Sequence, residues 1–159
     1  MKKILVSILV AFVSLNLFSL PNIKLSYSGE TFFTINDNNL YNPDGELAFS
    51  NINGTLYYPS GENSNQTISE TDEIIEIIDT ENGILRFSKK NGNLIYRESK
   101  YGLEKYIEYF DDESGNKLTE EKYFLDLLES VVTHVYEKGL NTKIIEKDAK
   151  GNYLSSIIV

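Results

Sequence analysis

Short apolar or aromatic runs alternate with polar clusters along most of the chain. In residues 85–88, 94–97 and 107–109, apolar or aromatic side chains alternate with charged or polar ones. Successive side chains of a strand point to opposite faces, so this period of two predicts a sheet with one solvated face. The runs predict strands at residues 24–35, 45–50, 54–59, 73–79, 83–89, 93–99, 104–111, 117–124, 131–137, 142–147 and 153–158.

Asn-Gly dipeptides lie between several of these runs and begin at Asn53, Asn82 and Asn91. Asn and Gly adopt the positive φ angles of tight hairpin turns at little steric cost. The polar residues 61–72 predict a loop. Together these signals predict a mainly β protein, an antiparallel meander of tandem β-hairpin repeats that forms one long twisted sheet.

Residues 120–138 are compatible with two structures. Apolar residues from Phe124 to Val135 recur at helical spacing, which is compatible with a short helix near 120–130. Residues 130–136, however, are dense in β-branched side chains, which fit a pleated surface better than a helix. We favour a strand and keep the helix as the alternative.

The N-terminus has the layout of a signal peptide. Lys2 and Lys3 precede an apolar stretch of 17 residues at positions 4–20, which predicts a signal peptide at 1–20 and a single β-repeat domain at 21–159. A small-residue cleavage site fits loosely at Leu17-x-Ser19. A retained membrane anchor is the alternative, because a spanning helix needs ~17–25 residues. With cleavage we expect no stable membrane span and a periplasmic or extracellular location.

Charge and composition narrow the classes of partner and site. The chain has a net charge of −9 and no cysteine, which argues against nucleic-acid binding and excludes disulfide scaffolds. The single histidine, His134, lacks the partners of a nucleophilic triad. Residues 111–116 resemble a calcium loop in composition, but the ligand spacing fails. We therefore predict no catalytic residue, no metal site and no cofactor.

A short sequence motif recurs along the chain: an aromatic or apolar strand end, a few polar residues, Gly, and often Leu. It occurs at 41–47, 57–62, 87–94, 109–118 and 145–154, with irregular spacing. The motif resembles the MORN-variant repeat of bacterial YwqK-type antitoxin-like proteins. The resemblance implies a chain of hairpins with an interaction role rather than catalysis.

One basic segment stands out in an acidic chain. Residues 86–105 carry six basic and two acidic residues, whereas residues 21–85 carry one base and 11 acids. The basic residues are Arg86, Lys89, Lys90, Arg97, Lys100 and Lys105. The local alternation predicts that Arg86 and Arg97 share the face opposite Phe87, Leu94 and Tyr96. Either these charges pair with acidic strands, or they form a docking patch for an anionic partner.

These observations together favour an exported, non-catalytic protein that binds another protein or a cell-surface polymer. An antitoxin or immunity-like inhibitor is one alternative, and a small carboxylate-dependent hydrolase is another. The 11 Tyr and 8 Phe residues are expected mainly to pack across strands, although an exposed tyrosine row on one face would count toward a carbohydrate-binding or ligand-stacking surface.

Overall fold

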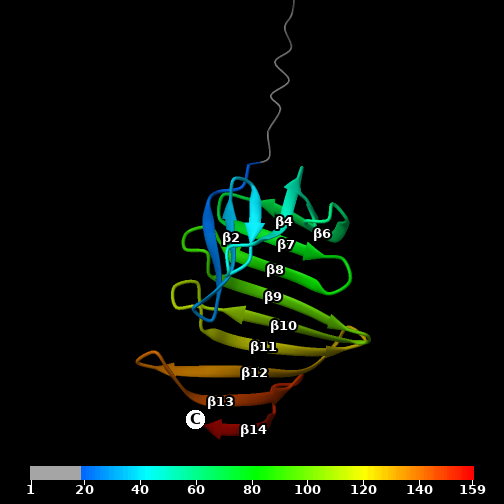
Figure 1. The fold of residues 1–159 in the computed structure, drawn as a ribbon. Coiled ribbons are helices and arrows are strands. Elements are labelled where there is room, and N and C mark those ends of the chain that lie inside the picture. The colour runs from blue at the N-terminus through cyan, green and yellow to red at the C-terminus, as the bar shows by residue number, and fades with distance from the viewer. Residues whose placement is uncertain (1–18) are drawn as a thin grey trace, which may run out of the picture.

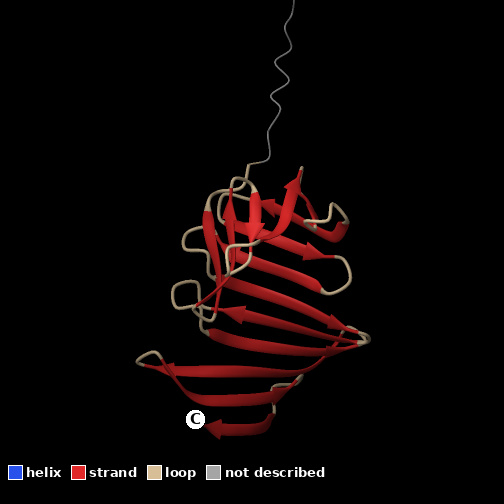
Figure 2. Cartoon of the chain, viewed as in Figure 1, coloured by secondary structure: helices blue, strands red, loops and turns tan. Residues whose placement is uncertain are grey.

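Each strand pairs antiparallel with its neighbours in sequence, so one sheet runs in the order β1 to β14 (Figure 1). This computed structural model describes residues 19–159, in which every regular element is a strand (Figure 2). The strands are β1 (Ile23–Tyr27), β2 (Glu30–Asn36), β3 (Asn39–Tyr41), β4 (Leu47–Ile52), β5 (Thr55–Tyr57), β6 (Asn63–Glu70), β7 (Ile74–Asp79), β8 (Gly83–Ser88), β9 (Leu94–Tyr101), β10 (Glu104–Phe110), β11 (Lys117–Phe124), β12 (Leu127–Glu137), β13 (Leu140–Asp148) and β14 (Tyr153–Ile158).

The predicted antiparallel meander of hairpins is confirmed, and residues 120–138 form strands rather than a helix. Two predictions of individual elements are wrong. Residues 24–35 form two strands that turn at Gly29, and the predicted loop at 61–72 contains β6. The loop was predicted because residues 61–72 are polar and contain almost no apolar residue. In β6 the polar Ser64 nevertheless faces inward, where its hydroxyl donates to the Leu56 carbonyl at 2.7 Å. The predicted signal peptide lies almost wholly outside the described residues.

The Asn53-Gly54 dipeptide makes the tight turn that its composition predicts. Ile52 pairs with Thr55 across the turn, and the two central residues have φ angles of 52° and 86°. Positive φ at both central positions matches the right-handed twist of the flanking strands. The local sequence therefore determines the register of this hairpin.

The N-terminal strands fold back across the middle of the sheet (Figure 1). The Ser26 amide donates to the Gly92 carbonyl at 2.8 Å, and Ser26 forms a parallel bridge with Asn93. The rings of Tyr27 and Phe110 meet edge to face at 5.6 Å. β1 thus contacts the turn before β9, so the sheet from β1 to β9 curls back on itself. We call this part of the sheet the roll.

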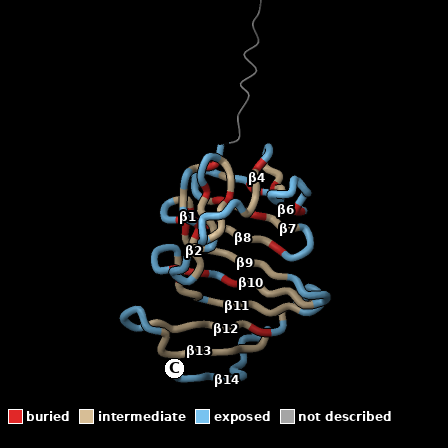
Figure 3. The backbone as a smooth tube through the Cα atoms, in the orientation of Figure 1, coloured by how far each residue is buried: buried red, intermediate tan, exposed pale blue. Residues whose placement is uncertain are grey.

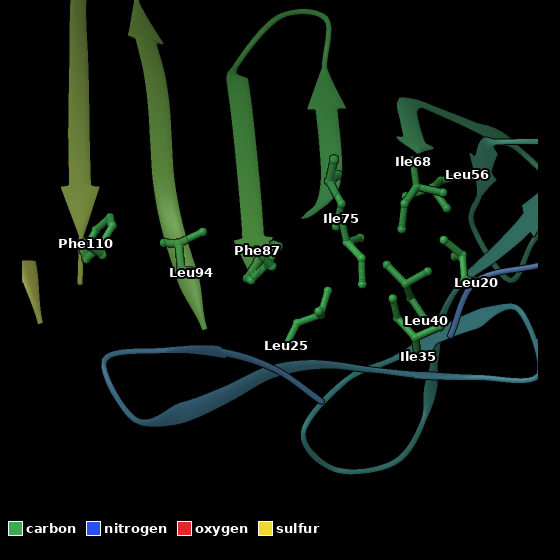
Figure 4. Packing of buried hydrophobic residues seen from close by; sticks show 11 residues of the cluster. Leu20, Leu25, Ile35, Leu40, Leu56, Ile68, Ile75, Phe87, Leu94 and Phe110 are labelled. Atoms are coloured by element: carbon green, nitrogen blue, oxygen red, sulfur yellow. The ribbon is translucent and has the colours of Figure 1, made fainter. Parts of the chain in front are cut away.

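Apolar side chains from both walls of the roll form the core (Figure 4). Leu25 and Ile35 come from the N-terminal strands, whereas Ile75 and Phe87 come from the central sheet, and all four are fully buried. The whole buried cluster comprises Leu20, Leu25, Ile35, Leu40, Leu56, Ile68, Ile75, Ile77, Phe87, Leu94 and Phe110. No member of the cluster lies in β11–β14, where burial is sparse (Figure 3). The core therefore belongs to the N-terminal two thirds of the sheet.

No helix in the described part of the chain has the length and apolar character to cross a membrane.

Candidate binding surface

The structure gives a carboxylate partner to every residue of the predicted basic patch. Each basic nitrogen lies within salt-bridge distance of at least one acidic oxygen. The pairs are Arg86–Glu76 at 2.6 Å, Lys89–Glu70 at 2.9 Å, Lys90–Glu113 at 3.7 Å, Arg97–Glu108, Lys100–Glu98 at 3.1 Å and Lys105–Asp126 at 3.0 Å. The six residues therefore do not form a surface of unpaired cations.

The prediction that Arg86 and Arg97 share a face is wrong. A bulge between Arg86 and Phe87 shifts the register of the β8–β9 ladder. Arg86 pairs with Tyr96, whereas Leu85 pairs with Arg97. Directly paired residues project on the same side of a sheet. Arg97 therefore lies on the core side with Leu85, and Arg86 lies on the opposite side with Tyr96.

The side of the sheet opposite the core carries a row of aromatic and basic side chains. We call this the tyrosine row and define it as Tyr96, Tyr109 and Tyr123 with the flanking Arg86 and Lys105. Paired positions on β8–β11 align these five residues on one face. Tyr109 is 38% exposed, and the other four are half-buried. The row is thus accessible to a partner but held by its neighbours.

Short contacts join the members of the tyrosine row in two groups, Arg86–Tyr96–Tyr109 and Lys105–Tyr123. The Arg86 guanidinium lies 4.5 Å from the centroid of the Tyr96 ring. The Tyr96 and Tyr109 rings meet edge to face at 5.6 Å, and the Lys105 ammonium lies 4.7 Å from the Tyr123 centroid. Cation–π and aromatic pairs of this kind contribute ~0.5–1.5 kcal/mol each. The contacts hold the rings in a defined arrangement before any partner arrives.

Carboxylates orient two of the phenol groups. The Tyr96 hydroxyl donates to Glu98 at 3.1 Å, and the Tyr123 hydroxyl donates to Glu121 at 2.7 Å. Burial, together with the hydrogen bond to Glu98, raises the pKa of Tyr96 to about 12. The hydrogen bond to Glu121, followed by burial, raises the pKa of Tyr123 to about 12. Both phenols therefore remain protonated donors at neutral pH.

A buried ion cluster occupies the core side of the sheet behind the tyrosine row. The Glu108 side chain is only 3% exposed and contacts both Arg97 and Lys117. Burial acts to raise the pKa of Glu108, but the hydrogen bonds from Lys117 and Arg97 outweigh burial and hold the pKa below its ordinary value. Lys117 also contacts Glu120 at 2.9 Å. This cluster balances its own charge and fixes the register of β9, β10 and β11.

A pocket of about 330 Å³ lies on the core side, between the rolled N-terminal strands and β7–β9. Phe32, Phe33 and Tyr101 contribute to its apolar lining, and Asp79 lies at its polar part. Burial acts to raise the pKa of Asp79, but hydrogen bonds from Gln66 and Asn82 lower it to about 2. The Asp79 carboxylate is therefore an ionised group that holds a turn rather than a proton donor.

The remaining polar residues considered in the sequence, His134 and the turn at 111–116, are engaged in local hydrogen bonds. The Asn141 amide lies 2.9 Å from Nδ1 of His134, and burial and the charge of Lys117 hold the pKa of that imidazole below its ordinary value. The Asp111 carboxylate accepts from the amide and hydroxyl of Ser114, as in a self-contained turn. Among the residues described, no group of three or more His, Asp or Glu side chains is placed to hold a metal ion.

Comparison with known proteins finds distant structural similarity. No protein-family model matches the chain, and no curated protein matches it in sequence. A solved structure, "Crystal Structure of TarM", aligns with a TM-score of 0.38 and 19% identity over 55% of this chain. The alignment spans 17% of that protein's length. A similarity of this size supports no inference about function, and the MORN-variant resemblance stays a prediction.

Proposed function

We propose that the protein is an exported, non-catalytic interaction module that binds another protein through the tyrosine row. The observation that carries this proposal is the alignment of Tyr96, Tyr109 and Tyr123 with Arg86 on the side of the sheet opposite the core. Tyrosine and arginine are enriched among the residues that dominate protein–protein binding energy. A ring presents a large apolar area together with a polar hydroxyl, so it suits a partly wet interface.

The row is organised before binding, which favours affinity. Immobilising a flexible side chain at an interface costs ~0.5–1.5 kcal/mol. Here Arg86 is already held by Glu76 at 2.6 Å, and the Tyr96 and Tyr123 hydroxyls are held by carboxylates. A partner therefore meets rings whose freedom is already restricted, and less of the interaction energy is lost to ordering.

The charges around the row determine how binding responds to salt. Arg86 and Lys105 are each paired with a carboxylate, so the surface carries both signs rather than a single basic field. Ionic strength screens long-range attraction between unlike net charges. Binding through the row should therefore depend only weakly on salt, unlike docking onto an unpaired basic patch.

Paired substitutions on the two faces of the sheet test the proposal. Tyr96→Ser with Tyr109→Ser removes the edge-to-face pair of the row, whereas Tyr101→Ser with Tyr106→Ser removes a similar pair on the core side, with centroids 6.2 Å apart. The partner would be captured by crosslinking in the native envelope, identified by mass spectrometry and purified for affinity measurement. Loss of two interface anchors at ~2 kcal/mol each should weaken binding well over tenfold.

The control pair should leave the affinity unchanged because it faces the other way. Equal affinity of the row variant and the wild type would contradict the proposal, as would equal losses in both variants. Capture of a polysaccharide would favour the cell-surface polymer as ligand. A toxin encoded beside this gene and captured by it would favour the inhibitor alternative.

A further inference from the structure

The last strand of the sheet has an unpaired edge. All six residues of β14 are exposed, and among residues 19–159 its one neighbour is β13. Figure 3 shows this strand as exposed throughout, at the end of the sheet farthest from the core. An edge of this kind presents backbone donors and acceptors that can pair with another strand.

The other end of the sheet is protected by the fold itself. β1 is covered where the Ser26 amide donates to the Gly92 carbonyl at 2.8 Å and where Ser26 bridges Asn93. Within residues 19–159 the two edges are therefore not equivalent, because the roll covers β1 at Ser26 and no described strand pairs with the outer edge of β14.

β14 lacks most of the features that usually prevent edge pairing. Soluble proteins blunt exposed edges with charged residues, proline, bulges or a covering segment. Residues 153–159 contain no charged residue and no proline, and Ile157, Ile158 and Val159 are 60%, 86% and 69% exposed. One bulge interrupts the ladder with β13, near Lys147. Beyond that bulge β14 consists of two serines and two isoleucines and carries no charged side chain.

The hydrogen-bond pattern shows which backbone groups are free. The Val159 amide donates inward to the Thr142 carbonyl at 3.2 Å, and Ile157 pairs with Ile144 two positions along the same ladder. Backbone groups of successive residues alternate in direction along a strand. The amide and carbonyl groups of Ser156 and Ile158 therefore point outward, toward solvent.

We propose that β14 pairs with β14 of a second copy, antiparallel about a two-fold axis at Ser156, to form a dimer with one continuous sheet. This register brings Ser156 opposite its own equivalent and Leu154 beside Ile158, so that apolar side chains meet across the seam. In this register each residue of β14 lies opposite an uncharged residue of the second copy. The interface is distinct from the tyrosine row.

Charge and topology both select a second copy as the occupant. The chain has a net charge of −9, but residues 140–159 carry three basic and two acidic residues, so like copies repel least at this end. Head-to-tail pairing of β14 with β1 is obstructed at Ser26, in the middle of the β1 edge, which already bonds to Gly92 and bridges Asn93. The remaining self-pairing is isologous, and such an interface closes at two subunits rather than growing into a filament.

Sedimentation velocity over a range of concentrations on the full chain, purified from its host, tests the proposal. We expect a reversible dimer for the wild type. Ser156→Pro removes an outward amide without breaking a bond to β13, and Ile158→Lys adds a charge at the seam, so both should be monomers with an unchanged circular dichroism spectrum. The matched control Leu103→Lys changes a residue that is 61% exposed in the turn between β9 and β10, and this variant should remain a dimer.

A crosslinking test is independent of the folding of those variants. The chain has no cysteine, and directly opposed residues in a hydrogen-bonded pair lie ~5.5 Å apart, within the range that a disulfide spans. Ser156→Cys should therefore form a covalent dimer under mild oxidation, and Leu103→Cys should not. A monomeric wild type, equal crosslinking of the two variants, or a dimer that persists in folded Ser156→Pro and Ile158→Lys would each overturn the proposal.

Discussion

Replacing Glu108 with glutamine tests how much the buried ion cluster stabilises the middle of the sheet. The glutamine has nearly the same size as the native side chain but no charge. Arg97 and Lys117, which now share the Glu108 carboxylate, would then face a neutral amide. Because Glu108 is 3% exposed, the loss falls at a site that water cannot readily fill.

The expected destabilisation at pH 7 follows from the exposure of the two cations. Removing one partner of a fully buried ion pair costs ~3–5 kcal/mol. Here Arg97 and Lys117 keep 34% and 26% of their side-chain surface in water, and Lys117 retains Glu120 at 2.9 Å. Partial solvation reduces the cost, so we expect the free energy of unfolding to fall by about 2 kcal/mol. That loss corresponds to a decrease in Tm of roughly 4–8 °C.

The pH dependence has a defined sign. The pKa of Glu108 lies below its ordinary value of 4.5 in the folded protein, whereas in the unfolded chain it returns to about that value. The folded state therefore gains stability above the unfolded pKa and loses it as pH falls through the folded pKa. The gap between wild type and Glu108→Gln should be complete at pH 7 and shrink below about pH 4.5.

Urea unfolding followed by circular dichroism at several pH values measures this gap. Glu104→Gln is the matched control, because Glu104 contacts Lys122 at 3.4 Å from a side chain that is 41% exposed, and it should change stability little. Equal stability of wild type and Glu108→Gln at pH 7 would refute the reasoning. A gap that is the same at pH 3 as at pH 7 would also refute it, since the loss would then come from packing rather than charge.

Three further predictions concern the close approach of β1, the phenols and the N-terminus. In Gly92→Ala the added Cβ would lie 1.8 Å from the Lys24 carbonyl oxygen at a φ of +79°, so thermal unfolding should show a loss of more than ~1 kcal/mol; an unchanged Tm would contradict the docking of β1. In an absorbance titration, Tyr96 and Tyr123 should ionise near pH 12, and Tyr96→Phe should remove one of these late transitions. If the protein is exported, N-terminal sequencing should give a mature chain that begins at Leu20 or Pro21, as cleavage after Ser19 or at the predicted boundary after residue 20 would leave; a start at Met1 in the soluble cytoplasm would contradict export.

The hairpin architecture can be predicted from sequence because its causes are local. Asn53 and Gly54 have the positive φ angles that their side chains tolerate, and the β-branched run at 130–136 forms part of β12. β6 could not be predicted in the same way, because Ser64 faces inward and is satisfied by a carbonyl on a neighbouring strand. A polar residue can be buried when a group on another strand satisfies its hydrogen bond, but the sequence alone does not distinguish such a residue from one in a loop.

The candidate surface depends on register, which the sequence pattern does not contain. A single bulge next to Arg86 places Arg97 on the other side of the sheet, so counting alternate residues leads to the wrong face. Tyr96 and Tyr123 each have a glutamate two residues away. Residues at this spacing share a strand face, so the glutamate carboxylate can accept a hydrogen bond from the tyrosine hydroxyl. That spacing is a usable signal for the tyrosine row, whereas basic residues alone show nothing about their partners.

The strictly sequential strand order has a consequence for how the chain folds. Each ladder joins strands that are adjacent in sequence, so most of the sheet can be assembled hairpin by hairpin with short loop closures. The bridge from Ser26 to Asn93 is different, because it closes a long segment and carries a larger entropic cost. During synthesis the β1–β2 hairpin lacks its backbone partners until the turn before β9 has been made. We therefore expect the roll to close late, after the ladders that form its opposite wall.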